Sequence, residues 1–285
     1  MVVKRERGKR EKMIPKVVIL QADTTAAFLL RQHKQHIIRL TKGINKLEQE
    51  IVDLFSEGLK RQNGFLISTK VQLVQAKVLH AQMIKIIEND YGVPYKAVVK
   101  DFDRTAKRIG THINRAYNKT TKFVGADVVL IDQLKSVARA HFKAYGQYAA
   151  DEIAQAMYNV VATNGKFSTL TKKIKAALTG QTDIAGRPLE IHAKTIAFDA
   201  QRNMSHNLLL KKSKDINISD NFLYYGSLMK TSRQFCKDRA GKVFTRAEID
   251  GWNKLSWQGK RGDFWQFRAG FNCRHVLIPV KKEWL

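Results

Sequence analysis

Two cysteines and one histidine near the C-terminus have side chains that could bind a metal ion. Cys273 and His275 are two residues apart, so in an extended strand their side chains point to the same face. Cys236 would have to approach them across the fold, and a fourth ligand such as His206 or Asp238 would complete a tetrahedral zinc site. Because the chain has no Cys-x-x-Cys pair, we expect no cofactor and keep zinc as an alternative.

The same residues allow three further interpretations. Cys236 and Cys273 could form a disulfide, or they could be packed free thiols, which is the default for two cysteines in a reducing cytoplasm. The Asn-Cys-Arg-His run could belong to a metal-dependent nuclease, with His275 as general base and Asp238 or Asp263 holding the ion. The paired cysteine ligands and the histidine pair of such nucleases are absent from the sequence, so we expect no catalytic residue and no enzyme activity.

The spacing of apolar residues predicts that the chain is helical from about residue 24 to 178. Apolar side chains recur every three or four residues, which places them on one face of each successive helix. An Asn-Gly pair at 63–64 is expected to end the first helix, and the Tyr-Gly-Val-Pro run at 91–94 to break the second. The four stripes are Ile44, Leu47, Ile51, Leu54, Phe55 and Leu59; Leu73, Ala76, His80, Ile84 and Ile87; Phe102, Ala106, Ile109, Ile113 and Tyr117; and Leu134, Val137, Ala138, Tyr145, Ala149, Ile153, Ala156 and Val160.

Two shorter helical patterns follow these four. The first carries Leu170, Ile174 and Leu178 and is expected to stop at Gly180. Residues 181–188 (Gln-Thr-Asp-Ile-Ala-Gly-Arg-Pro) predict a loop and a domain boundary. One side of the next helix carries Ile191, Thr195, Phe198, Arg202 and Leu209.

After this helix the pattern changes to short strands and turns. Residues 222–226, 241–244 and 275–280 are rich in aromatic or β-branched side chains and predict three strands. Thr245 and Glu248 have the capping-box spacing, which predicts a helix start. Such aromatic density indicates a compact core built from loops and short strands. The four tryptophans are Trp252, Trp257, Trp265 and Trp284, and the glycines expected at turns are Gly241, Gly259, Gly262 and Gly270.

The predicted fold class is therefore α+β and predominantly helical, with a helical N-terminal domain and a small Trp-rich α+β module. The expected boundaries are a basic flexible arm over 1–23, a helical domain over 24–188 and an α+β domain over 189–285. Since no apolar run is long enough to span a bilayer, we expect no membrane partner.

The charge of the chain is strongly positive. Lysine and arginine number 51 against 25 acidic residues, a net charge of +26 that is spread along the sequence. Because self-repulsion of this size disfavours a compact state unless a polyanion offsets it, we expect non-specific contact with double-stranded DNA. The alternatives are docking on an acidic protein and plain solvation. The candidate contact residues are Arg5, Arg7, Lys9 and Arg10 in the arm, and Arg233, Lys237, Arg239, Lys242 and Arg246 along a basic edge of the module.

Several short motifs follow one another between residues 221 and 280. A Phe-Cys pair comes first, Gly-Lys-Val-Phe follows at 241–244, and Ala-Gly-Phe-Asn-Cys-Arg-His stands at 269–275. This order resembles the C-terminal domain of phage Mu F-like head morphogenesis proteins, also called minor head or minor capsid proteins. Many members have Asn-Cys-Arg-Cys, so the role of a second cysteine would pass to His275. The residues that carry the resemblance are Cys236, Gly241, Phe244, Glu248, Trp252, Trp257, Gly270, Asn272, Cys273, Arg274 and His275.

The resemblance implies a structural protein of a tailed bacteriophage virion. Proteins of this family are associated with the portal vertex during head assembly, and some members contact packaged DNA. We therefore expect the portal protein, capsid or scaffold proteins and packaged double-stranded DNA as partners. The expected location is the host cytoplasm during assembly and the capsid interior near the portal vertex afterwards. A metal-dependent nuclease or DNA-processing enzyme that uses the region of Cys236, Cys273 and His275 is the alternative function.

Overall fold

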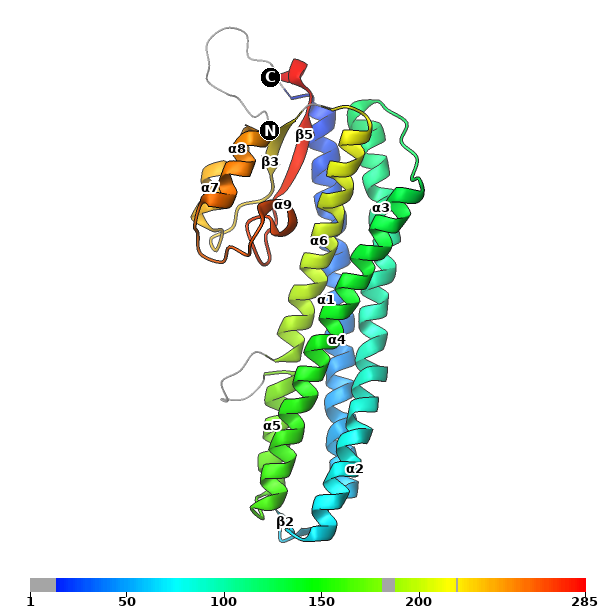
Figure 1. The fold of residues 1–285 in the computed structure, drawn as a ribbon, viewed down its shortest axis with the longest axis vertical. Coiled ribbons are helices and arrows are strands. Elements are labelled where there is room, and N and C mark those ends of the chain that lie inside the picture. Colours follow the sequence, from blue (N-terminus) through cyan, green and yellow to red (C-terminus); the bar gives the residue numbers. More distant parts are fainter. Residues whose placement is uncertain (1–13, 181–187, 219) are drawn as a thin grey trace. The chain divides into compact units, whose positions relative to one another are not determined.

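The structure is a computed structural model that describes residues 14–180, 188–218 and 220–285. It is mostly helical with a small C-terminal antiparallel sheet, which confirms the predicted fold class. No helix in the described part of the chain is long and apolar enough to cross a membrane. The long elements are α1 (Lys16–Gly58), α2 (Lys70–Ile86), the π-helix η1 (Ile87–Tyr91), α3 (Gly92–Tyr117), α4 (Gly125–Ala162), α5 (Phe167–Leu178) and α6 (Leu189–Asp215) (Figure 1).

The chain divides into two compact units. The first unit holds the N-terminal segment up to Gln32 together with Asp101–Leu134 and Phe198–Leu285. The second unit holds His33–Lys100 and Lys135–Ala197. Each unit is thus assembled from segments that are far apart in the sequence. Helix α1 begins at Lys16, within the segment expected to be a flexible arm.

The helical stripes form most of the core as predicted. On α3, Phe102, Ile109 and Ile113 are completely buried, and on α1 the same holds for Ile44 and Ile51. Three stripes are wrong in part: Val137, in the stripe on α4, is exposed. Leu73 and Ile191 are exposed, because α2 turns Gln72, Ala76, Leu79 and Met83 inward and α6 turns Leu189, Ala193 and Ala197 inward.

The Asn-Gly pair at 63–64 does not end a helix, and that prediction was wrong. Helix α1 stops at Gly58, and the pair forms the two-residue turn of a hairpin between β1 (Arg61–Gln62) and β2 (Phe65–Leu66). Both turn residues have positive φ, 53° and 81°, as this hairpin turn requires.

The break expected at 91–94 is also absent. Helix α2 continues through η1 into α3, so that Pro94 lies in the first turn of α3. Proline has no amide hydrogen to donate to a carbonyl of the preceding turn, and Pro94 follows closely on the π-helical turn η1. The wider π-helical turn just before it therefore takes the place of a chain break.

The C-terminal module contains the three predicted strands. Strand β3 (Asn221–Tyr225) lies between β4 (Val243–Thr245) and β5 (Val276–Val280), and both pairings are antiparallel. Figure 1 shows the short helices grouped beside β3 and β5. The remaining short elements are α7 (Gln234–Arg239), α8 (Arg246–Gly251), η2 (Trp252–Lys254), α9 (Phe264–Phe267) and η3 (Lys282–Trp284).

The start of α8 confirms the capping box. The Glu248 amide donates to the Thr245 hydroxyl over 3.2 Å, and the Thr245 amide donates to the Glu248 carboxylate over 2.7 Å. These reciprocal bonds satisfy two amides that the helix leaves unpaired. Helix α8 then leads directly into Trp252, which enters the core of the module.

An aromatic core fills the module. The Trp252 ring meets those of Phe235, Phe244 and Phe264 edge to face, with centroids 5.4, 4.9 and 4.8 Å apart. Trp257 and Trp265 pack against this core from its margin. Trp284 instead stacks on Tyr117 at 5.9 Å, so three of the four tryptophans belong to the module core, as predicted from their density.

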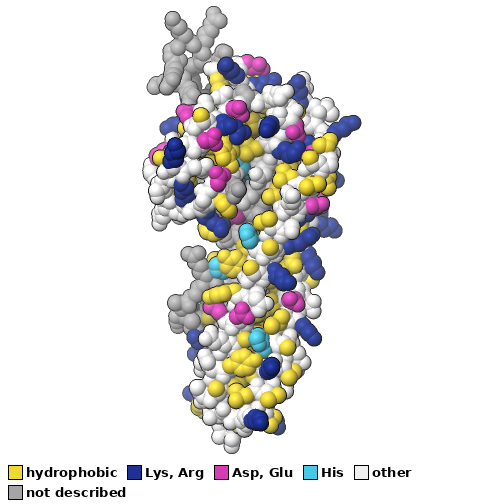
Figure 2. Space-filling view, in the orientation of Figure 1, with side chains coloured by type: hydrophobic (Ala, Val, Ile, Leu, Met, Phe, Trp, Pro, Cys, Tyr) yellow, Lys and Arg dark blue, Asp and Glu magenta, His cyan; other side chains and the backbone are white. Residues whose placement is uncertain are grey.

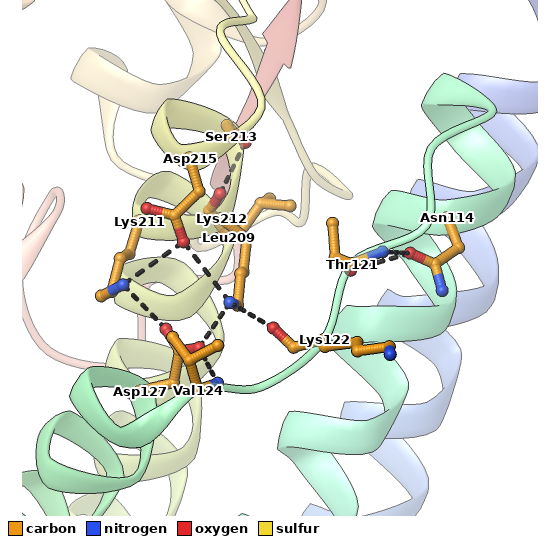
Figure 3. A network of polar contacts seen from close by, with 10 residues as sticks. All are labelled: Asn114, Thr121, Lys122, Val124, Asp127, Leu209, Lys211, Lys212, Ser213 and Asp215. Carbon is orange, nitrogen blue, oxygen red and sulfur yellow. Dashed lines mark hydrogen bonds and ion pairs between the residues drawn. The ribbon is translucent and has the colours of Figure 1, made fainter.

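A buried ion network joins α4 to α6 within the first unit (Figure 3). The Asp127 side chain is completely buried and pairs with Lys211 at 2.8 Å and with Lys212. The Val124 amide donates to the same carboxylate over 2.8 Å, and Lys212 also donates to the Lys122 carbonyl. Burial alone would raise the pKa of Asp127, but the bonds from the two lysines hold it below its ordinary value.

Candidate functional site

The structure brings Cys236, Cys273 and His275 together. Cys236 lies on α7, whereas Cys273 and His275 lie just before β5. One ligand atom from each of the three lies within 4.8 Å of the other two, and all three residues are buried. Cys236 thus approaches the other two residues across the fold, as a shared site would require.

Tyr224, on the central strand β3, positions this cluster. Its hydroxyl lies 3.3 Å from the Cys236 sulfur and 3.8 Å from the Cys273 sulfur. Its ring stacks on His275 with the centroids 4.8 Å apart and the planes 5° from parallel. Sequence reasoning missed this residue, because its part depends on the pairing of β3 with β5.

Both cysteines are free thiols, which agrees with the default interpretation and not with a disulfide. The hydrogen bond from Cys236 lowers the pKa of Cys273 well below its usual range; burial opposes this effect, while His275 and Arg268 add to it. The same hydrogen bond, together with burial, raises the pKa of Cys236.

Two buried arginines support the loop that carries Cys273. Arg268 donates to the Cys273 carbonyl over 3.0 Å and lies 3.7 Å from the Asp199 carboxylate. Arg202, on α6, donates to the Arg274 carbonyl over 3.1 Å. These residues carry buried positive charge close to the cluster, and no sequence motif indicated them.

The other ligands considered from the sequence do not join the cluster. His206 is completely buried, and burial, followed by the charge of Arg268, lowers its pKa to about 3. Asp238 is exposed and accepts a hydrogen bond from Gln234, while Asp263 accepts from Asn253 and from the Trp265 amide. Within the described part of the chain, the group with metal-ligand spacing consists of the two cysteines and His275.

An open pocket of about 500 Å³ lies against the cluster. Arg233 stabilises the wall of the pocket, because its guanidinium donates to the carbonyls of Gln258 and Phe271 over 3.0 and 2.9 Å. The pocket is open to solvent, and the three buried residues of the cluster are part of its lining. The pocket is lined by Ser227, Met229, Thr231, Ser232, Arg233, Cys236, Gln258, Gly259, Phe271, Asn272, Cys273, Arg274 and His275.

Gly270 allows the two loops of this wall to approach closely. Its φ is +106°, and a Cβ at this position would lie 1.9 Å from the Gly259 carbonyl oxygen. Gly241, Gly259 and Gly262 also have positive φ, so the prediction of turn glycines is confirmed.

Replacing Gly270 with alanine is expected to lower the free energy of unfolding by at least about 2–3 kcal/mol, since neither the backbone angle nor the space admits a side chain. Urea unfolding followed by tryptophan fluorescence measures this loss. Gly251→Ala is the matched control, because Gly251 has helical φ and open space around it. Equal urea midpoints for the two variants would refute the assignment of Gly270.

The basic residues expected along one edge of the module have different surroundings. Lys237 and Lys242 are exposed. The Arg239 guanidinium lies over the Phe235 ring at 3.9 Å, and Arg246 pairs with Asp220 at 3.2 Å. Arg233 donates to the Gln258 carbonyl in the pocket wall. All three arginines therefore make contacts within the module. The arm residues Arg5, Arg7, Lys9 and Arg10 lie outside the described residues.

A basic patch that sequence reasoning missed lies on α1 and α3 in the first unit; it consists of Arg31, Arg104, Lys107, Arg108 and Arg115. Burial, followed by the charges of Arg115 and Arg31, lowers the pKa of Arg108, so these like charges lie close enough to repel one another. Arg104, Arg108 and Arg115 are four and seven residues apart, which places them on one face of α3, and this periodicity could have predicted the patch.

Acidic side chains are also present near the basic ones. Arg104 pairs with Asp101 at 3.1 Å, which neutralises one charge of the basic patch. On the face drawn in Figure 2, Lys and Arg side chains are scattered, with Asp and Glu among them. The excess positive charge is therefore distributed, as the sequence indicated, and the basic patch is a local concentration of it.

No protein-family model, curated protein or solved structure matches the chain.

Proposed function

We propose that the protein is a structural minor head protein of a tailed bacteriophage that contacts packaged DNA without sequence specificity. The observation that carries the proposal is the role of the residues shared with the Mu F-like domain. Phe244 and Trp252 belong to or pack against the aromatic core, Glu248 caps α8, and Gly270 permits the closest approach of two loops. The residues that carry the resemblance therefore include ones that form the framework of one small module.

The partners in this proposal are the portal protein, capsid or scaffold proteins and double-stranded DNA. A distributed positive charge of +26 suits a position beside densely packed DNA, because phosphate contacts release counterions and remove self-repulsion. The basic patch is the part of the described surface where this argument is strongest, since its charges already repel one another.

Deleting the gene from the phage or prophage that encodes it tests the assembly role. We expect particles that lack DNA or infectivity, restored by supplying the full chain in trans, and we expect mass spectrometry to find the protein in wild-type virions. In the genome, we expect portal and terminase genes upstream of the gene for this protein. Normal, infectious particles from the deletion strain would refute the proposal.

The variant Lys107→Ala/Arg115→Ala tests the DNA contact. Both side chains are exposed in the basic patch, so we expect weaker gel-shift affinity and a log–log salt slope reduced by about 0.9 for each phosphate that is no longer neutralised. Lys172→Ala/Lys173→Ala removes the same charge from an exposed part of α5 and should change the slope less. Wild-type binding that is absent at low salt, or that does not weaken as salt rises, would refute the DNA contact.

Metal-dependent DNA cleavage is the competing function, favoured by the position of His275 beside two cysteines at an open pocket. A plasmid nicking assay with Mg²⁺ or Zn²⁺ separates the two functions. We expect no nicking. Metal-dependent nicking that disappears in His275→Ala would replace the purely structural function with an enzymatic one.

A further inference from the structure

Two buried thiols and a buried imidazole have no part in the assembly role proposed above. We propose that Cys236, Cys273 and His275 bind one zinc ion, through two sulfurs and one imidazole nitrogen, and that the fourth coordination position faces the open pocket. The proposal rests on the geometry of the module and does not depend on the phage function.

The spacing of the ligand atoms fits a zinc ion. A tetrahedral ion bonded at about 2.3 Å to sulfur and about 2.0 Å to nitrogen holds its ligand atoms about 3.5–3.8 Å apart. In the structure these atoms lie within 4.8 Å of one another, so small side-chain rotations close the site. The Nε2 atom of His275 is buried and has no hydrogen-bond partner among the described residues. A buried, unsatisfied nitrogen is costly, and a metal bond removes that cost.

The donor set favours zinc over magnesium or calcium. Two sulfurs and one imidazole are the ligands of zinc, whereas magnesium and calcium prefer oxygen. The Tyr224 hydroxyl lies 3.3 Å from the Cys236 sulfur and 3.8 Å from the Cys273 sulfur. Its ring also holds the His275 imidazole in place by stacking. Tyr224 therefore orients the ligands without binding the ion itself, as residues around protein zinc sites commonly do.

A charged pair lies beside the cluster. Arg268 is buried and donates to the Cys273 carbonyl, and the Asp199 carboxylate lies 3.7 Å from its guanidinium. One zinc ion and two thiolates together are neutral, so the filled site adds no further positive charge beside Arg268.

The fourth position is left to solvent. The cluster has three ligand residues in the described part of the chain, and all three line the pocket. A zinc ion with three protein ligands keeps one exchangeable position, which water fills. A small thiol or anion that enters the pocket would compete with that water.

The first test measures metal in the full-length chain, purified without a polyhistidine tag and without chelator. We expect elemental analysis to find one zinc ion per chain. After chelation and addition of Co²⁺, we expect a thiolate-to-cobalt charge-transfer band in the near ultraviolet and strong visible bands of a tetrahedral ion. Substoichiometric zinc together with no cobalt bands would overturn the proposal, as would a Cys236–Cys273 disulfide found by mass spectrometry.

Variants then assign the ligands. Cys273→Ser and His275→Asn are expected to lose the zinc and the cobalt bands, whereas His141→Asn, an exposed histidine on α4, keeps both. His275→Cys is expected to retain the ion with a stronger charge-transfer band, because a thiolate replaces the imidazole. If Cys273→Ser and His275→Asn fail to fold, the spectrum of the cobalt-loaded His275→Cys variant provides the test. An unchanged charge-transfer band in that variant would show that His275 is not a ligand.

Discussion

Replacing Asp127 with alanine is expected to lower the free energy of unfolding by about 3–5 kcal/mol, because it leaves the buried Lys212 ammonium without its main counter-charge. Lys212 is 3% exposed, and its remaining acidic neighbour, Asp215, is partly exposed and 3.4 Å away. The Val124 amide at the start of α4 also loses its acceptor. Chemical unfolding followed by circular dichroism measures the loss.

Asp132→Ala is the matched control, because Asp132 lies on the same helix with an exposed side chain. The control should change the unfolding free energy by less than about 1 kcal/mol. If both variants were destabilised by the same amount, the buried network would not have the energetic role assigned to it.

The pH dependence of stability gives an independent check on Asp127. Its pKa is lowered in the folded state, so the unfolded state binds the proton more tightly and stability falls with acidification. The ionised Asp127 carboxylate contributes its full stabilisation above the unfolded pKa of about 3.9. This stabilisation is lost as the pH falls through the lower pKa of the folded state. The difference between wild type and Asp127→Asn should therefore stay constant from neutral pH to about pH 5 and shrink below about pH 4.

Replacing Trp252 with alanine is expected to cost about 3–5 kcal/mol, since it empties the centre of the module core. The ring contacts three phenylalanine rings and Tyr224, and Arg239 lies 5.0 Å from its centre. We expect the near-ultraviolet circular dichroism of the module to collapse and its loops to become sensitive to protease, while most helical signal remains.

Trp284→Ala provides the comparison for this loss. Trp284 is partly exposed and stacks on Tyr117 alone among the described rings, so its removal should cost about 0.5–1.5 kcal/mol. Two variants with the same protease sensitivity would show that Trp252 is not central to the module.

The Asn-Gly pair at 63–64 shows why part of the fold could not be predicted from sequence. Such a pair can end a helix or turn a hairpin, since both need positive φ. Contacts far along the chain select the hairpin: the Leu66 amide donates to the Gly165 carbonyl, and the Phe167 amide donates to the Gly64 carbonyl. Local sequence contains no information on these partners.

Elements whose signals are local could be predicted from the amino-acid sequence. Helical periodicity placed the cores of α3 and α4, the Thr245–Glu248 spacing placed the start of α8, and aromatic density predicted the core around Trp252. The sequence also indicated the three residues of the cluster, because Cys273 and His275 are close in sequence and cysteines are rare in the chain.

The folded arrangement was needed to show that Cys236 joins those two residues, and that Tyr224 and Arg268 surround them. The same holds for the basic patch, where Arg31 of α1 comes near α3. This difference arises because caps, turns and helical faces depend on neighbours within a few residues. The cluster and the patch depend on strand register and helix packing between segments far apart in the chain.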